Sequence, residues 1–295
     1  MPRSPVEPPT KVGKVLFPTR NYDLAATLTS GQAFGWDETA EGWTGVVLGR
    51  WVRLRQVPEG ILAQTATPQT DWHWLAEYLQ LNVNLQEILA TFPDDPHLAA
   101  AIAACPGLRL LRQDPWECLA SFILSSTKQI VQIRQIVAEL RARFGAPVKT
   151  LGPGPAFSFP GAERLAAASE TDLRACKMGF RAPYLLAVAR AVASGECDLI
   201  ALGQLSLEEA QARLVKLPGV GTKIADCVLL FAYGFSTAFP VDVWVRRALE
   251  QFYFRGRRVK LTRLHSFITS HFGPNAGYAQ QYLFHYIRTQ SRPDR

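Results

Sequence analysis

The 295-residue sequence predicts an α+β fold in which an N-terminal antiparallel β-rich domain precedes two mostly α-helical lobes. Two changes of pattern predict this fold. Between Phe34 and Gln64, aromatic and β-branched residues come in short runs that glycine, glutamate and proline separate, as is typical of an antiparallel meander. After residue 70, apolar residues recur at spacings of three and four, which indicates helices. We therefore assign residues 1–13 to a flexible tail, 14–105 to the β-rich domain and 106–295 to the helical region.

The tail is assigned on its composition, since it holds four prolines and few large apolar side chains.

Asp114-Pro115 is a strong start signal for a helix, with aspartate as the cap and proline at the first helical position. The Gly- and Pro-rich stretch 151–161 is expected to be a loop that divides the helical part into its two lobes. The strands are expected at 34–36, 43–47, 51–54 and 61–64, and the clearest helices at 74–81, 119–123 and 130–140.

The charge balance favours an anionic partner, because the net charge is +7 and the sequence pI is about 9.3. A generally basic enzyme would show the same balance. No stretch approaches the roughly 18 consecutive apolar residues of a membrane helix, and the first residues lack the apolar segment of a secretory signal. We expect an intracellular protein of the cytoplasm, nucleoid or nucleus, with no membrane partner.

The cysteines do not suggest a metal or disulfide framework, because they are scattered, odd in number and without a C-x-x-C pair. This argues against structural zinc and against a four-cysteine iron-sulfur cluster. The five are Cys105, Cys118, Cys176, Cys197 and Cys227.

The most informative segment is the Pro-Gly-Val-Gly turn that contains Gly219, Val220 and Gly221. An amphipathic helix from Ser206 leads into it, and a second helix is expected to start at Thr222 or nearby. This is a helix-hairpin-helix pattern. Its glycines permit a sharp turn, and the amides at the start of the second helix can hold phosphate. An ordinary turn between packed helices is the alternative. A phosphate-binding hairpin would indicate DNA without specifying its sequence.

Lys223 and Asp242 are the candidate catalytic residues. Lys223 lies in the first turn of the second helix, where the helix dipole disfavours a cation and so favours the neutral amine that a nucleophile needs. A simple phosphate contact is the alternative role. Asp242 precedes an apolar helix that it could cap, and capping is compatible with catalysis. Asp226 is a rival carboxylate, but its position inside the helix favours packing or support of the amine.

These motifs resemble the 8-oxoguanine DNA glycosylases. The pairing of L-P-G-V-G-T-K-I-A-D-C with P-V-D-V is highly specific, and the resemblance covers roughly residues 15–290. The branches of the superfamily that usually carry an iron-sulfur cluster are not matched. Further matching segments are 30–36, 113–118, 125–126, 179–182 and 277–284.

The resemblance implies that Lys223 attacks the sugar C1′ of a flipped nucleotide and that Asp242 supports the positive charge, with strand nicking by β-elimination. Gly31 would sense the N7 hydrogen of the lesion through its carbonyl. The base would lie between Phe284 and Cys227, and Gln280 would read its Watson-Crick edge. Gln280 and Phe284 share a helix face. Core packing is the alternative role for Phe284.

The resemblance also implies residues that hold the duplex. Phe180 would fill the gap left by the flipped base, and Arg181 would read the opposite base. Thr127 and Lys128 are expected to contact DNA. The backbone carbonyls of Val215, Leu217 and Val220 would bind a structural cation at the hairpin, and no cofactor is required. The partner is duplex DNA carrying an oxidised base, bound by a monomer because the duplex must occupy the cleft.

Two departures from the family pattern affect specificity. Thr127-Lys128-Gln129 replaces a run of asparagines, and Gln132 stands where an arginine is expected, so we expect a relaxed preference for the base opposite the lesion. Trp244 stands where histidine is common, which alters a phosphate contact beside the lesion. A glycosylase for another damaged base and a non-catalytic DNA-binding protein are the alternative functions; the first is disfavoured by Lys223.

Overall fold

The computed structural model describes residues 12–125 and 129–290. Thr127 and Lys128, two of the predicted DNA contacts, lie outside the described residues, as does most of the predicted tail. None of the helices in these two ranges combines the length and the apolar character needed to cross a bilayer.

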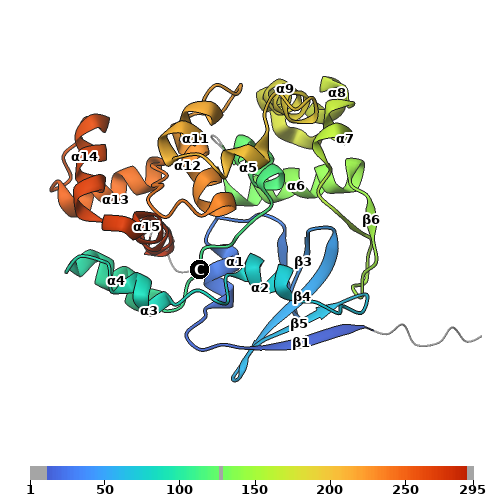
Figure 1. The fold of residues 1–295 in the computed structure, drawn as a ribbon, viewed down its shortest axis with the longest axis horizontal. Coiled ribbons are helices and arrows are strands. Elements are labelled where there is room, and N and C mark those ends of the chain that lie inside the picture. Colours follow the sequence, from blue (N-terminus) through green and yellow to red (C-terminus); the bar gives the residue numbers. More distant parts are fainter. Residues whose placement is uncertain (1–11, 126–128, 291–295) are drawn as a thin grey trace, which may run out of the picture.

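The N-terminal part contains a five-stranded antiparallel sheet with the strand order β1-β5-β4-β3-β2 (Figure 1). The predicted meander is therefore confirmed. Of the predicted run 34–36, only Trp36 is in a strand, because the carbonyl of Gly35 bonds to a side chain instead of a neighbouring strand. The strands are β1 (Gly13–Pro18), β2 (Trp36–Thr39), β3 (Gly42–Val47), β4 (Arg50–Val57) and β5 (Gly60–Thr65).

Strand β1 was not predicted, and it begins at Gly13, one residue before the start assigned to the β-rich domain. It pairs with β5, with Val15 opposite Ala63. Its side chains alternate between half-buried and exposed, but the exposed position of Leu16 hides this alternation in the sequence. Pairing with β5 therefore decides that this segment is a strand.

One face of the sheet packs on helix α2 (His73–Leu79). Val52, Leu54 and Ile61 of the sheet are fully buried against Leu75 and Leu79 of α2. Burying such side chains contributes roughly 1.5–3 kcal/mol each, so this small core holds the sheet and the helix together.

Helices dominate the rest of the described chain, as predicted. The predicted start of α5 is confirmed, since the Glu117 N–H donates to the Asp114 carboxylate at 2.8 Å. The first helices are α1 (Leu24–Thr29), α2 (His73–Leu79), α3 (Leu85–Leu89), α4 (Pro96–Ala104), α5 (Pro115–Ser125), α6 (Ile130–Phe144), α7 (Ala162–Ala166) and α8 (Glu170–Leu173). The others are α9 (Ala182–Ala193), α10 (Leu199–Leu202), α11 (Leu207–Leu214), α12 (Thr222–Val228), α13 (Val243–Tyr253), α14 (Leu261–His271) and α15 (Ala276–Gln290).

The packing does not follow the assigned boundary at residue 105. Helix α4 lies beside α15, at the far end of the chain (Figure 1). Leu85 and Leu98 belong to the larger helical core and not to the core of the sheet. Residues 85–105 therefore pack with the C-terminal helices, although they precede the helical region in sequence.

The stretch 151–161, expected to be a loop, contains a short strand. Strand β7 (Ala156–Phe157) pairs with β6 (Pro147–Val148) to form a two-stranded ladder. The ladder pairs residues that are only eight and ten positions apart, and the glycines and prolines between them form its turn.

Candidate active site

The predicted helix-hairpin-helix is present. α11 ends at Leu214, after which the Leu217 N–H donates to the Leu214 carbonyl at 3.0 Å and the Val220 N–H donates to the Leu217 carbonyl at 3.1 Å. Gly219 has a φ of +76°, and a Cβ there would lie 2.8 Å from the ring of Tyr184. The turn therefore needs glycine at this position.

The second helix of the hairpin borders an open groove. α12 begins at Thr222 with Gly221 as its N-cap, which provides no side chain for the first amides. A Cβ on Gly221 would meet nothing within 4 Å. Gly219 and Gly221 line the outer groove, an open hollow of about 1,290 Å³. Amides at a helix start carry partial positive charge, so this edge suits an anion.

Lys223 projects from the first turn of α12 toward α5. Its amine donates to the Ser125 hydroxyl at 3.2 Å and lies 5.1 Å from the ring centroid of Phe122. Lys223 is half-buried and lines both the outer groove and a smaller inner pocket. The amine is therefore held at the junction of the two hollows.

Asp242 lies at the same junction. It caps α13, since the Val245 N–H donates to its carboxylate at 2.8 Å. Asp242 also lines both the inner pocket and the outer groove. The cap fixes the carboxylate beside the space that the Lys223 amine borders, so capping does not remove it from the site.

The inner pocket, a hollow of about 290 Å³, brings together residues that are far apart in sequence. All four predicted base-pocket residues line it, together with the two candidate catalytic residues. Its full lining is Gly31, Phe122, Lys223, Cys227, Phe231, Pro240, Asp242, Gln280, Gln281 and Phe284.

Gln280 offers an unused acceptor in this pocket. The residue is 4% exposed, and its side-chain carbonyl oxygen has no hydrogen-bond partner among the described residues. Buried polar atoms are rarely left unpaired, so such an atom facing a pocket indicates a missing donor. A planar base with N–H groups on its edge would supply that donor.

Cys227 and Phe284 provide apolar surfaces to the pocket. Burial raises the pKa of the Cys227 thiol to about 12, although the nearby Lys223 opposes this shift. The thiol is therefore protonated and serves as a soft packing surface and not as a nucleophile. The Phe284 ring is half-buried, and the Arg288 guanidinium lies 5.4 Å from its centroid.

Gly31 requires glycine for two reasons. Its φ is +81°, and a Cβ would lie 2.9 Å from Ile130 and 3.1 Å from both Phe284 and Arg288. A side chain at this position would therefore strain the backbone and narrow the pocket.

The backbone around Gly31 is held by distant side chains. Arg288 donates to the Thr29 carbonyl at 2.6 Å, and Gln281 donates to the Ser30 carbonyl at 3.0 Å. Following Gly31, the Gln113 amide donates to the Gln32 carbonyl at 2.7 Å. Buried hydrogen bonds of this kind fix the direction of a peptide. The Gly31 peptide is therefore placed by contacts on both sides of it.

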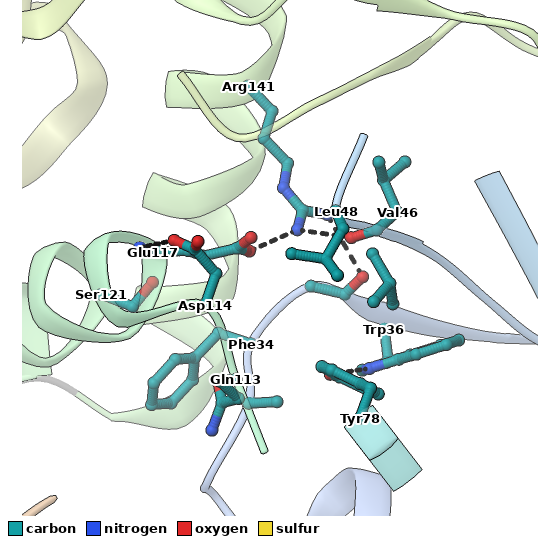
Figure 2. Close-up of a pocket in the computed structure, with 13 residues that line it drawn as sticks. Phe34, Trp36, Val46, Leu48, Tyr78, Gln113, Asp114, Glu117, Ser121 and Arg141 are labelled. Carbon is teal, nitrogen blue, oxygen red and sulfur yellow. Dashed lines mark hydrogen bonds and ion pairs between the residues drawn. The ribbon is translucent and has the colours of Figure 1, made fainter. Parts of the chain in front are cut away.

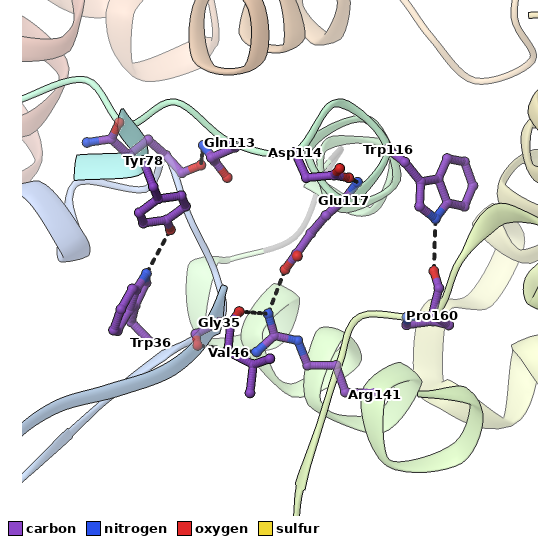
Figure 3. A network of polar contacts seen from close by, with 11 residues as sticks. Gly35, Trp36, Val46, Tyr78, Gln113, Asp114, Trp116, Glu117, Arg141 and Pro160 are labelled. Atoms are coloured by element: carbon purple, nitrogen blue, oxygen red, sulfur yellow. Dashed lines mark hydrogen bonds and ion pairs between the residues drawn. The ribbon is translucent and has the colours of Figure 1, made fainter. Parts of the chain in front are cut away.

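Arg141 extends this support toward the sheet (Figure 3). It pairs with Glu117 at 2.6 Å and donates to the carbonyls of Gly35 and Val46, each at 3.3 Å. Burial raises the pKa of Glu117, while Arg141 opposes the shift. These four residues also line a cavity of about 420 Å³ between α5 and the sheet (Figure 2), which includes neither Lys223 nor Asp242. Arg141 thus joins the sheet to the helix that carries Ser125.

Asp226 faces α11 and not the pocket. The Gln211 amide donates to its carboxylate at 2.5 Å. Burial raises the pKa of Asp226 to about 6, and the Gln211 hydrogen bond opposes this shift. Asp226 therefore ties together the two helices of the hairpin.

Phe180 and Arg181 differ in exposure, although the sequence suggested an exposed pair. Phe180 is 56% exposed, whereas Arg181 is only 2% exposed. The Arg181 guanidinium lies 4.4 Å from the centroid of the Phe180 ring. Arg181 is therefore buried and packs against its neighbour's ring, so the expected exposed pair is wrong for Arg181.

Trp244 borders the outer groove. It is 38% exposed, and the Arg247 guanidinium lies 5.7 Å from its ring centroid.

In residues 12–125 and 129–290, no group of three or more histidine, cysteine, aspartate or glutamate side chains is arranged to hold a metal ion.

Sequence reasoning missed several pocket residues. Phe122 and Phe231 have no signal that separates them from core aromatics, and their rings stack 5.6 Å apart. Ser125 was noted only as part of a matching segment, yet it contacts the Lys223 amine. Gln281, adjacent to a predicted residue, holds the Ser30 carbonyl. The sequence offers one local signal for Gln281: a glutamine that stands among the apolar residues of α15 and is buried with them.

The fold and the site define a base excision DNA repair protein of the helix-hairpin-helix superfamily, and the model of that superfamily matches residues 120–266. The model described as the 8-oxoguanine DNA glycosylase N-terminal domain matches residues 14–119. The chain belongs to the 8-oxoguanine DNA glycosylase family.

Named relatives agree with this assignment. An N-glycosylase/DNA lyase of Arabidopsis thaliana is 31% identical, over 88% of this chain and 76% of the relative. The solved structure of MBOgg1 with a low-affinity DNA ligand is 35% identical, with a TM-score of 0.90 over 95% of this chain and 96% of that one. The Clostridium acetobutylicum 8-oxoguanine glycosylase/lyase, solved with DNA that contains cytosine opposite the lesion, is 29% identical, with a TM-score of 0.87 over 94% and 99% of the two chains.

Proposed function

We propose that this protein excises 8-oxoguanine from duplex DNA and then nicks the strand at the abasic site, as a bifunctional glycosylase and lyase of base excision repair. One observation carries the proposal: Lys223 and Asp242 both border a pocket in which the buried Gln280 oxygen lacks a donor. A nucleophile, a carboxylate and a base-reading amide in one pocket suit excision of a flipped base.

The damaged nucleotide leaves the stack because its reactive atoms are inaccessible inside the duplex. In the pocket, its base lies between Phe284 and Cys227. The Gln280 oxygen accepts from the N–H groups of the Watson-Crick edge, and the Gly31 carbonyl accepts from the N7 hydrogen that undamaged guanine lacks. The hydrogen bonds to the Thr29 and Ser30 carbonyls support this role by fixing the neighbouring peptides.

Excision begins when the Lys223 amine forms a bond to the sugar C1′. The bond from C1′ to the base breaks, and the base leaves with the electron pair and takes up a proton. Asp242 stabilises the positive charge that develops on the sugar. Loss of a proton from the amine and opening of the sugar produce an imine between Lys223 and C1′. Removal of a C2′ proton then expels the 3′ phosphate oxygen, which cleaves the strand.

The hairpin and Phe180 hold the duplex during these steps. The amides of Gly219 and Gly221 bind phosphate, whereas the Val220 N–H stays bonded to the Leu217 carbonyl and so is not the phosphate donor that the sequence suggested. The exposed Phe180 ring fills the space of the flipped base. Arg181 reads the opposite base after moving out from beneath Phe180.

The carbonyls of Val215, Leu217 and Val220 would hold a structural cation between the hairpin and a phosphate. The donor set fits a hard cation, because all three ligands are oxygens. The Leu217 carbonyl accepts one hydrogen bond, from the Val220 N–H, and so keeps a second lone pair. The cation would supply positive charge to the phosphate contact.

Lys223 is tested as the nucleophile with an end-labelled duplex that contains 8-oxoguanine opposite cytosine. With borohydride present, the wild type should form a stable covalent complex, because reduction traps the imine. Lys223→Gln should lose both crosslink and cleavage and still bind DNA. Lys14→Gln, which removes an exposed lysine from β1, is the matched control and should crosslink normally. Absence of a wild-type crosslink with binding intact would refute the proposal in favour of another lesion or a binding module.

The opposite-base preference should be relaxed. Gln132 uses its side chain to accept from the Gln129 N–H at 3.1 Å, and so caps α6 where the family pattern has an arginine. We expect equal single-turnover excision rates from pairs with cytosine and with adenine. Strict dependence on cytosine would contradict this.

A further inference from the structure

The turn between α13 and α14 carries an unusual concentration of positive charge. Residues 251–263 contain five basic residues and no acidic one, in a chain whose total net charge is +7. We call this set, which comprises four residues of the turn and one of the first turn of α14, the basic turn: Arg255, Arg257, Arg258, Lys260 and Arg263, all exposed.

No carboxylate of the described residues forms an ion pair with the basic turn, although Arg258 is among the groups that lower the pKa of Glu250, after its hydrogen bonds to Arg246 and Val259. Among the described residues, none of its five members takes part in an ion pair within 4.0 Å. The nearest acid in sequence, Glu250, pairs with Arg246 at 3.0 Å and also accepts from the Val259 N–H at 3.3 Å. Exposed charges of one sign attract a polyanion and cost stability through mutual repulsion, so the cluster needs a functional reason.

The backbone leads the basic turn back to the outer groove. Arg246, on the second turn of α13, donates to the Val259 carbonyl at 3.0 Å, so Val259 lies alongside the start of that helix. Leu261, the first residue of α14, lines the outer groove together with Asp242 and Arg246. Lys260 therefore lies at the rim of the groove that Lys223 and Asp242 border.

The other arginines lie further out. α13 has 11 residues and so spans about 16 Å, which places Arg255 and Arg257 about that far from Asp242 along the helix axis. This distance corresponds to about five base steps at roughly 3.4 Å each. Figure 1 shows α13 and α14 at one end of the long axis of the molecule.

We propose that the basic turn binds the phosphate backbone of one arm of the duplex, beyond the nucleotides that the hairpin and the pocket contact. This inference rests on the proposed function, because the duplex must lie in the outer groove. Phosphate is the ligand because flexible arginines on an exposed turn suit a repeating row of anions and require no base sequence. Two anchors, the hairpin and the basic turn, then hold the duplex on either side of the pocket opening.

The test compares DNA affinity at several salt concentrations. The variant Arg255→Gln, Arg257→Gln, Arg258→Gln removes three charges from exposed positions. Lys14→Gln, Arg20→Gln, Arg55→Gln removes three exposed charges from the β-rich part and is the matched control. The probe is a 30-base-pair duplex with one uncleavable abasic-site analogue, so the result does not depend on excision. Circular dichroism melting verifies that both variants fold.

The measured quantity is the slope of the logarithm of the DNA-binding constant against the logarithm of salt concentration. In the basic-turn variant this slope should be less steep than in the wild type, by up to about 0.9 for each phosphate contact that is removed. With three contacts, wild-type affinity should fall about 40-fold more than that of the variant between 50 and 200 mM salt. The control variant should follow the wild type.

Duplexes shortened on one side of the abasic site locate the contact. Removing one arm, and not the other, should reduce the wild-type slope to that of the basic-turn variant, and should leave the variant unaffected. The inference would be refuted if the variant kept the wild-type salt slope. It would also be refuted if the slopes of the wild type and the variant still differed whichever arm was removed. A wild type that binds with the expected slopes but forms no borohydride crosslink would refute the proposed nucleophile and leave the basic turn supported.

Discussion

The inner pocket and the DNA-facing surface are built in different ways. The pocket combines residues from positions 31, 122, 223 and 280, which only the folded chain brings together. The hairpin is a continuous segment from Leu207 to Val228, and the basic turn is another from Arg255 to Arg263. Recognition of the base therefore depends on long-range packing, whereas binding of the backbone depends on local segments.

This difference predicts different responses to substitution. Pocket residues lie within shared buried hydrogen bonds, so a change at one position moves its neighbours. Surface charges act almost independently, and salt screens them. Asp242 belongs to both regions, because it lines the pocket and the groove.

After the loss of the Lys223 nucleophile, replacement of Asp242 should have the largest effect. Asp242→Asn keeps an oxygen that can accept from the Val245 N–H, so the melting temperature should change little. Excision should slow by about 10²–10⁴-fold, because the negative charge is lost. Asp242→Ala should show the same loss of activity and also lose about 1 kcal/mol of stability. Single-turnover rates and thermal melts measure the two effects; normal excision by the asparagine variant would rule out a role for the charge.

The pH dependence of stability tests the contact between Asp226 and Gln211, which joins the two helices of the hairpin. Because its pKa is raised to about 6 in the fold from an ordinary value of 3.8, the folded state holds a proton that the unfolded state releases between these values. The free energy of unfolding should therefore fall as pH rises from 4 to 6 and then level off. Two pKa units correspond to about 3 kcal/mol.

Asp226→Asn should remove this contribution. Relative to the wild type, the variant should gain about 3 kcal/mol of stability between pH 4 and pH 7. Urea unfolding at several pH values measures the difference. A difference that stays constant with pH would contradict the assignment.

Substitution of Gln281 tests the hydrogen bond that holds the wall of the pocket, and it should change stability less than the substitution of Asp226. Gln281→Met leaves the Ser30 carbonyl buried without its donor, which should cost about 2 kcal/mol of stability. Since Ser30 precedes Gly31, discrimination between 8-oxoguanine and guanine should fall by several fold. The salt slope should stay at the wild-type value, in contrast to the basic-turn variant. Gln251→Met, on the exposed face of α13, is the control; equal discrimination by both variants would refute the positioning role.

Much of the fold follows from local patterns. The strands of the meander and the start of α5 were predicted because alternation and capping act over a few residues. Strand β1 was missed because its pairing with β5 involves residues about 50 positions away. The short ladder of β6 and β7 was missed because Gly and Pro dominate its connection.

By itself, the sequence determined the hairpin and its lysine, because a glycine turn and a helix start are encoded within a few residues. Only the tertiary structure decided that Ser125 contacts the amine, that Arg181 is buried beneath Phe180, and that the peptides around Gly31 are held in place. The reason is separation along the chain: Gln281 lies 251 residues from Ser30, and Arg288 lies 259 from Thr29. Such bonds form only after burial removes the competing water, and no local pattern encodes which distant segments are buried together.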